Sequence, residues 1–209
     1  VHVPYVLYHW RKNANHSSFS TEFQDKSDLS AKKALEEYFE GKREVVPCNG
    51  LVGCWQIKKA EYEYPLVSII IPFRDKVHLL KQCVEGILNK TDYKNLEVLL
   101  VDNGSVELNT KKYLDNIKTD ARVHVYRDDR EFNYSRLNNE AAKEAQGELL
   151  LFLNNDIAMI DERWLRELVN AIEYENVGAA GGKLLYGNYN IQHAGVTTGI
   201  YEVAGHPFR

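Results

Sequence analysis

The chain has 209 residues, of which 44% are hydrophobic and 27% are charged. These values are close to those of ordinary soluble globular proteins, so the chain can build a core without disulfides or structural metals. Its formal net charge of -4 argues against nucleic acid as a partner, because nucleic acids select proteins with a basic face.

The cysteines and the apolar runs argue against a disulfide-rich, zinc-binding or membrane-spanning protein. Cys48, Cys54 and Cys83 are too few and too irregularly spaced for a disulfide framework or a zinc knuckle, so we expect reduced structural thiols. The longest apolar run, at residues 67–71, is far shorter than the roughly 20 residues that span a bilayer, and the chain opens without a signal-peptide pattern. The sequence predicts a cytoplasmic protein. Because the chain begins with Val and stops at Arg209, we expect a fragment of a longer one.

Residues 1–64 form the first predicted region. Residues 13–23 are rich in Ser and Asn and predict a loop. Apolar residues recur at helical spacing over residues 29–40, and Gly41 supplies a stop at the helix end. A short strand-like passage over residues 53–64 then leads into the second region.

Strands and helices alternate over residues 65–209. Nearly continuous apolar runs predict strands that are covered on both faces, and runs with helical spacing predict the helices between them. The predicted strands are 66–71, 96–101, 122–127, 148–153 and 177–185, and the predicted helices include 76–89, 135–145 and 162–174. This alternation implies parallel strands joined by right-handed crossovers, and hence an α/β fold with a doubly wound, mostly parallel sheet and an N-terminal helical extension.

Polar clusters follow three of the predicted strands. In a doubly wound sheet the ligand binds beyond the carboxyl ends of the strands, so we expect these clusters to converge on one cleft. The clusters are Pro72-Phe73-Arg74-Asp75, Asp102-Asn103-Gly104-Ser105 and Asn154-Asn155-Asp156. Each cluster alone is also compatible with an ordinary turn or helix cap. Three of them at three strand ends make that interpretation less attractive.

Each cluster offers a different chemical group. The Asp75 carboxylate and its loop backbone suit a ribose or a base edge, and Asp102 suits a base N–H or a ribose hydroxyl. Gly104 permits a tight turn after Asp102. Asp156 suits a hard divalent cation that neutralises a diphosphate, whereas Asn154 offers only a neutral amide oxygen. We therefore predict Asp156 as a ligand of Mg²⁺ or Mn²⁺, with modest affinity in the absence of nucleotide.

The order of these segments resembles that of the family 2 glycosyltransferases, which have the GT-A fold. The resemblance covers residues 65–209 and rests on the segments VSIIIPFRD, LEVLLVDNGS, FNYSRLNNEAAKEAQGELLLFLNND, VGAAGGKLLY and IQHAGV. It is greatest to the bacterial branch that acts on rhamnose-rich polysaccharides and O-antigens. It implies transfer of a sugar, with inversion, from a nucleotide-sugar donor to a polysaccharide or lipid-linked glycan acceptor, at the inner face of the cytoplasmic membrane.

The resemblance also implies roles for single residues. The positions that hold the nucleoside match Pro72, Phe73, Asp75 and Asp102, although most of the family has a small polar residue in place of Phe73. The Asp-x-Asp element matches residues 154–156, with an Asn replacing its first acid. The residues further assigned to the nucleotide sugar are Arg74, Asn103, Arg136, Asn138, Asn154, Asn155 and His193. For Arg136 a solvated side chain, and for His193 a partly buried structural histidine, are the open alternatives.

The catalytic base, the N-terminal region and the function class each leave an open question. The resemblance implies a general base, usually an Asp, from a segment after Arg209. Residues 2–11 resemble the end of an upstream glycosyltransferase module, the alternative being an extension packed on this domain. A nucleotidyltransferase or an NAD-dependent enzyme is disfavoured because no glycine-rich loop follows the first strand. A catalytically inactive scaffold module stays open, because Asn154 replaces an acid and the chain shows no motif for the base.

Overall fold

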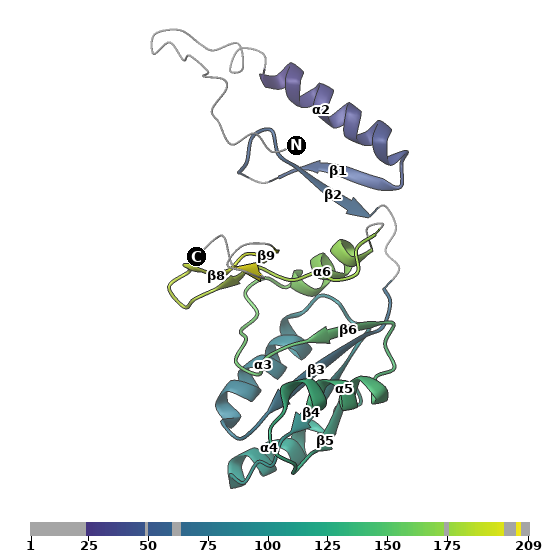
Figure 1. Ribbon diagram of the computed structural model, residues 1–209. Helices are drawn as coiled ribbons and strands as arrows, with labels where there is room; N and C mark the ends of the chain where they lie inside the picture. Colours follow the sequence, from purple (N-terminus) through teal and green to yellow (C-terminus); the bar gives the residue numbers. More distant parts are fainter. Residues whose placement is uncertain (1–23, 49, 60–63, 174–175, 199–203, 206–209) are drawn as a thin grey trace. The chain divides into compact units, whose positions relative to one another are not determined.

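The computed structural model describes residues 24–48, 50–59, 64–173, 176–198 and 204–205. Contacts divide the chain into two compact units, Val1–Tyr62 and Glu63–Arg209 (Figure 1). The predicted loop at 13–23 and the stretch at 2–11 lie outside the described residues. Each unit has its own helices and strands.

The described residues of the first unit form a helix and a hairpin. Helix α2 (Gln24–Phe39) contacts strand β1 (Arg43–Pro47), which pairs in antiparallel fashion with β2 (Trp55–Lys59). The helix begins earlier than the predicted start at residue 29, because its first turns are polar and therefore carry no apolar periodicity. It ends as predicted before Gly41, whose φ of 77° is a left-handed conformation that glycine adopts without strain.

The second unit is built on a four-stranded parallel sheet. The strands are β3 (Val67–Phe73), β4 (Leu96–Asp102), β5 (Val123–Arg127) and β6 (Leu149–Phe152). Their order is β5-β4-β3-β6, and each neighbouring pair is parallel. The chain first builds outward from β3 to β5 and then returns to the other side of β3, so the topological switch lies between β3 and β6. The predicted doubly wound α/β sheet is confirmed.

Helices cover both faces of this sheet. They are α3 (Val77–Lys90), α4 (Leu108–Ile117), α5 (Tyr134–Glu144) and α6 (Trp164–Ile172). Side chains alternate between the two faces along each strand, so Ile69 and Ile71 join the cluster with α3 and α4, whereas Ile70 joins the cluster with α5. Within the described part of the chain, no helix has the length and hydropathy that a membrane crossing requires.

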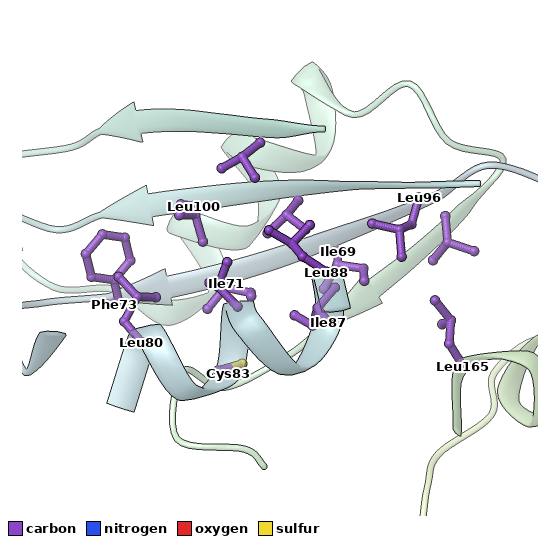
Figure 2. Packing of buried hydrophobic residues seen from close by; sticks show 14 of the residues in the cluster. Ile69, Ile71, Phe73, Leu80, Cys83, Ile87, Leu88, Leu96, Leu100 and Leu165 are labelled. Atoms are coloured by element: carbon purple, nitrogen blue, oxygen red, sulfur yellow. The ribbon is translucent and has the colours of Figure 1, made fainter. Parts of the chain in front are cut away.

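The larger core cluster lies between the sheet and α3. Figure 2 shows Ile69, Ile71 and Phe73 of β3 facing Leu80 and Ile87 of the helix. All five side chains are at most 5% exposed. Burial of one such side chain stabilises the fold by about 1.5–3 kcal/mol, so this cluster holds β3, and the loop that follows it, in a fixed position.

One charged side chain is buried on the opposite face of the sheet. Glu97 of β4 accepts hydrogen bonds at Oε1 from Ser68 Oγ (2.5 Å) and from the backbone N–H of Gln146 (2.7 Å). Ser68 Oγ in turn accepts the N–H of Gly147 (2.8 Å), and His124 Nε2 lies 3.4 Å from Glu97 Oε2. These bonds satisfy a carboxylate that would otherwise be costly to bury. They also anchor the turn between α5 and β6 to β3.

The predicted strand at 177–185 is wrong over most of its length. Only Leu184–Leu185 (β7) is extended, and it pairs in antiparallel fashion with β8 (Ile191–His193) in a separate two-stranded sheet. Three glycines precede β7, at positions 178, 181 and 182. Glycine lacks a side chain that packs on a sheet and loses more backbone entropy when ordered, which accounts for the missing strand. Residues Thr197–Thr198 (β9) and Ala204–Gly205 (β10) form another short antiparallel pair.

Candidate functional site

Three polar loops leave the same edge of the parallel sheet. We call them the β3 loop (residues 72–75), the β4 loop (residues 102–107) and the β6 loop (residues 154–156). Since β3 pairs in parallel with β4 on one side and with β6 on the other, the carboxyl ends of all three strands lie at one edge. Asp75 and Asp156 therefore stand on either side of the topological switch, the position at which doubly wound sheets bind ligands.

Asp75 joins the β3 loop to the β4 loop. Its Oδ1 accepts the backbone N–H groups of Val106 and Glu107, both at 2.9 Å. Its own N–H donates to Ser105 Oγ at 2.8 Å. Asp75 and Lys76 both have positive φ, at 52° and 49°. This backbone is uncommon outside glycine, and the bonds to the β4 loop hold it in place.

Asp102 is buried and has two internal partners. Its side chain is 3% exposed; Oδ1 accepts the N–H of Ser105 and Oδ2 accepts a hydrogen bond from Arg127, both at 2.8 Å. Arg127 stands opposite Asp102 in the β4–β5 pair and also donates to the Ser105 carbonyl (3.1 Å) and to Asp129. Each oxygen of this buried carboxylate therefore already has a protein donor.

Arg127 was absent from the predicted site residues. The available signal was its position, because it closes the third predicted strand as Asp102 closes the second. In parallel neighbours such residues become adjacent, which places a guanidinium beside a buried carboxylate.

Asn103 connects the β4 loop to the segment after β5. Its Nδ2 donates to the carbonyls of Asp128 (2.8 Å) and Arg130 (2.9 Å), and its N–H donates to the carbonyl of Phe73 (2.9 Å). The guanidinium of Arg130, hydrogen-bonded to Asp128, holds the pKa of that carboxyl far below its usual value, and Arg136 adds to the effect. The segment after β5 is therefore an ion-paired support for the β4 loop.

Arg136 and Asn138, at the start of α5, face protein partners. The Arg136 guanidinium donates to the carbonyl of Glu131 (2.6 Å), and its Nε lies 3.6 Å from Asp128 Oδ2. Asn138 is 4% exposed, and its Nδ2 donates to the carbonyl of Tyr134 (2.8 Å). These contacts organise the start of the helix. The contact with a nucleotide sugar that the resemblance implies stays a prediction for both residues.

The residues before Asp75 have different surroundings. Phe73 is 5% exposed and belongs to the core cluster with α3, so only its backbone can face a ligand at the sheet edge. Pro72 is half-buried, and Arg74 is exposed. Among these three, Arg74 has the side chain that a bound anion can reach.

The β6 loop lies against α3. The thiol of Cys83 donates to the carbonyl of Asn154 at 3.6 Å. Burial raises the pKa of Cys83 to about 12, and the negative charge of Asp156 contributes in the same direction, so this carboxylate lies close to the helix. Asn154 and Asp156 are exposed and Asn155 is half-buried, which leaves the Asp156 oxygens accessible.

The donor set around Asp156 suits a shared cation. Across the residues that the structure describes, no three His, Cys, Asp or Glu side chains gather as a metal site made only of protein requires. Mg²⁺ commonly takes one or two carboxylates from a protein and completes its shell with water and substrate phosphates. The residues at this position therefore fit a cation held jointly with a diphosphate.

His193 lies apart from the three loops in the topology. It ends β8 and stands opposite Leu184 of β7, in the two-stranded sheet that is separate from the four-stranded one. Its side chain is half-buried. The predicted contact of His193 with the sugar or diphosphate stays a prediction.

Comparison with protein families matches the part of the chain that carries these loops. The profile described as Glycosyl transferase family 2 matches residues 68–205. The chain belongs to glycosyltransferase family 2. The matched range contains all three loops and the four-stranded sheet except its first residue, Val67, so the family assignment and the candidate site rest on the same residues.

Two relatives of this family 2 chain match it over nearly its whole length. The uncharacterized protein y4gI of Sinorhizobium fredii is 40% identical over 209 residues, which cover 98% of this chain and 23% of that protein. The O-antigen biosynthesis protein RfbC of Myxococcus xanthus is 38% identical over 208 residues, which cover 99% of this chain and 16% of RfbC. The chain thus spans less than a quarter of the length of either relative.

A solved structure shows the same architecture. GalNAc-T7, crystallised with UDP, GalNAc and Mn²⁺, superposes with a TM-score of 0.52 and 21% sequence identity. The match covers 74% of this chain and 30% of that one. At this level of identity the likeness concerns the fold, and the family 2 chain has the predicted GT-A fold.

In this family 2 domain, Arg127→Ala is expected to lower the free energy of unfolding, because the buried Asp102 keeps only the Ser105 N–H as a partner. Urea denaturation measures the change. Arg163→Ala is the matched control, since Arg163 pairs with Asp161 where both side chains are 51% exposed. The control should lower the free energy of unfolding by less, because an exposed ion pair contributes little to stability. Equal losses in the two variants would contradict a special role for Arg127.

Proposed function

We propose that this family 2 domain binds a nucleotide-sugar donor and transfers the sugar, with inversion, to a polysaccharide or lipid-linked glycan. The observation that carries the proposal is the set of three polar loops at one edge of the parallel sheet, two of them beside the topological switch. The family membership supports glycosyl transfer. The name of RfbC, an O-antigen biosynthesis protein, supports a cell-surface polysaccharide as the product.

The nucleoside is proposed to lie on the β3 and β4 loops. Asp75 and Arg127 hold these loops in one shape through the bonds described above. Asn103 uses both Nδ2 hydrogens on carbonyls, which leaves its Oδ1 as the acceptor for a base N–H. The backbone of Pro72 and Phe73, with Asp102 beneath it, forms the floor of this part of the site.

The diphosphate is proposed to lie between Arg74 and Asp156. Arg74 is an exposed residue of the β3 loop and offers a cation to a phosphate, while Asp156 and Asn154 offer a carboxylate and an amide oxygen. Mg²⁺ or Mn²⁺, when bound here with the donor, supplies positive charge that stabilises the departing nucleoside diphosphate. GalNAc-T7, which has the same fold, was crystallised with UDP and Mn²⁺.

The acceptor side is proposed to lie largely outside residues 65–209. We assign the general base, which takes the proton from the acceptor hydroxyl, to a segment after Arg209. We assign residues 1–64 to the end of a preceding module and its linker. Arg136, Asn138, Asn155 and His193 are proposed as further contacts of the nucleotide sugar. The reaction is assigned to the inner face of the cytoplasmic membrane, where lipid-linked glycans are available as acceptors.

Calorimetric titration with UDP-, dTDP- and GDP-sugars tests the donor part of the proposal. One nucleotide class is expected to bind with a dissociation constant between about 1 μM and 1 mM, and more tightly with Mn²⁺ than without it. Absence of binding by every nucleotide sugar would refute the donor site. Equal affinity with and without Mn²⁺ would refute the shared cation.

An inactive scaffold module is the second candidate function, because Asn154 replaces an acid that the Asp-x-Asp element usually carries. An assay of the longer natural protein distinguishes the transferase from the scaffold. Donor binding together with release of nucleoside diphosphate in the presence of acceptor glycan supports the transferase. Donor binding without any such release supports the scaffold.

A further inference from the structure

Two of the three cysteines face each other at the end of the hairpin in the first unit. The β1–β2 register pairs Pro47 with Trp55, so the next pair outward is Cys48 with Cys54. The hydrogen bonding continues to this pair, because the N–H of Cys48 donates to the carbonyl of Cys54 at 3.0 Å. Residues that stand directly opposite in an antiparallel pair project their side chains from the same face.

The spacing of such a pair is close to that of a disulfide. Opposite residues that share backbone hydrogen bonds have Cα atoms about 5.5 Å apart, and disulfides join Cα atoms at roughly 4.4–6.8 Å. Their Cβ atoms, about 5.5 Å apart in a hydrogen-bonded pair, must approach to about 3.8 Å. The pair lies at the turn end of the hairpin beside Gly50 and Gly53, whose φ values are 76° and 74°.

Access distinguishes this pair from the third cysteine. Cys54 is exposed and Cys48 is half-buried, whereas Cys83 is fully buried in the core against α3. Burial raises the pKa of Cys83 to about 12, so its reactive thiolate is scarce at neutral pH. Cys83 therefore serves as an internal control for thiol chemistry at the hairpin.

We propose that Cys48 and Cys54 form a reversible disulfide that closes the end of the β1–β2 hairpin. The oxidant is a low-molecular-weight disulfide such as oxidised glutathione. One cysteine thiolate attacks it and forms a mixed disulfide, releasing the first glutathione thiol. The second cysteine thiolate then attacks the protein sulfur of that mixed disulfide and releases the second glutathione thiol. Two protein thiols are oxidised to one disulfide, and one glutathione disulfide is reduced to two thiols.

The geometry favours a bond that opens again under reducing conditions. Disulfides that depart from relaxed geometry or lie exposed are easier to reduce than buried structural ones, and the Cβ atoms here must be drawn together. Zinc is a poorer match for the pair, because a structural zinc site takes four ligands. Among the described residues no third His, Cys, Asp or Glu joins Cys48 and Cys54.

Thiol trapping across glutathione buffers tests the proposal on the whole chain. The protein is equilibrated from reducing to oxidising ratios, unfolded, alkylated and weighed intact. The reduced chain takes up three alkyl groups, one for each cysteine. The oxidised chain is expected to lose two hydrogens and to take up one alkyl group, which peptide mapping assigns to Cys83. Returning the sample to the reducing buffer is expected to restore all three.

Single substitutions separate the intrachain bond from other oxidation products. Cys48→Ser and Cys54→Ser are each expected to carry one glutathione adduct and no intrachain bond. Cys83→Ser is expected to form the Cys48–Cys54 bond as the natural chain does. Three alkyl groups at every buffer ratio, separate glutathione adducts on both hairpin cysteines, or covalent dimers in place of the intrachain bond would each overturn the proposal.

Discussion

Asp156→Asn is expected to remove the cation dependence of donor binding. The substitution keeps the size of the side chain and replaces the one accessible carboxylate of the β6 loop with a third amide, after Asn154 and Asn155. A contact made by a charged group contributes about 1.5–3 kcal/mol, and the neutral amide loses most of that contribution. The donor affinity measured with Mn²⁺ should therefore fall about 10–100-fold, to near its value without the cation. Calorimetry with and without Mn²⁺ measures both affinities.

Asp161→Asn provides a matched control for this substitution. Asp161 lies farther along the segment after β6, is exposed, and pairs with Arg163, so the same change of charge occurs away from the β6 loop. The control is expected to bind the donor as the natural chain does. If both variants lose affinity equally, the effect belongs to the net charge of the domain, and the assignment of Asp156 fails.

Gly147→Ala is expected to cost about 3 kcal/mol of unfolding free energy. A Cβ at this position would lie 2.5 Å from the carbonyl oxygen of Leu66 and 2.7 Å from the backbone N of Ser68, so the backbone itself must shift. The Ser68 hydroxyl, 2.6 Å away, would also be displaced from its bond to Glu97. Overpacking and a disturbed buried carboxylate act in the same direction. Urea denaturation followed by circular dichroism measures the loss.

Gly178→Ala is the control for glycine replacement. No described atom lies within 4 Å of a Cβ built at position 178, and this residue lies outside the helices and strands. The free energy of unfolding should change by no more than about 0.5 kcal/mol. A Gly147→Ala variant as stable as Gly178→Ala would show that the turn before β6 adapts freely, contrary to the close packing described above.

The sheet was predictable because its central strands β3 and β4 are buried on both faces. Residues 66–71 and 96–101 are nearly continuous apolar runs, a pattern that indicates parallel neighbours, and β3 and β4 occupy almost the same ranges. The position of the polar loops at one edge followed from that topology alone. The glycine-rich run at 177–185 misled the prediction, because three of its residues are glycines, which have no side chain to pack, and two are alanines, whose side chains are small.

Features that depend on register between strands were beyond the sequence. Glu97 lies inside an apolar run, and its burial is acceptable only because Ser68 and the turn after α5 stand opposite it. The pairing of Asp102 with Arg127 differs, because both residues close a predicted strand and the sequence therefore carried a signal for it. Phe73 is a different case, since counting alternate residues from Ile69 and Ile71 assigns it to the core face.

The hydrogen bonds of Asp75 and Asn103 have a consequence for redesign. The Asp75 side chain is hydrogen-bonded to the backbone of the β4 loop, and the Asn103 side chain is hydrogen-bonded to the backbone of the segment after β5. The conformation of each segment therefore depends on a side chain of the segment before it. Grafting a single segment from another transferase would leave unmatched partners on the adjoining one. Altered donor preference is therefore best sought by exchanging the β3 loop, the β4 loop and the segment after β5 together, all taken from the same transferase.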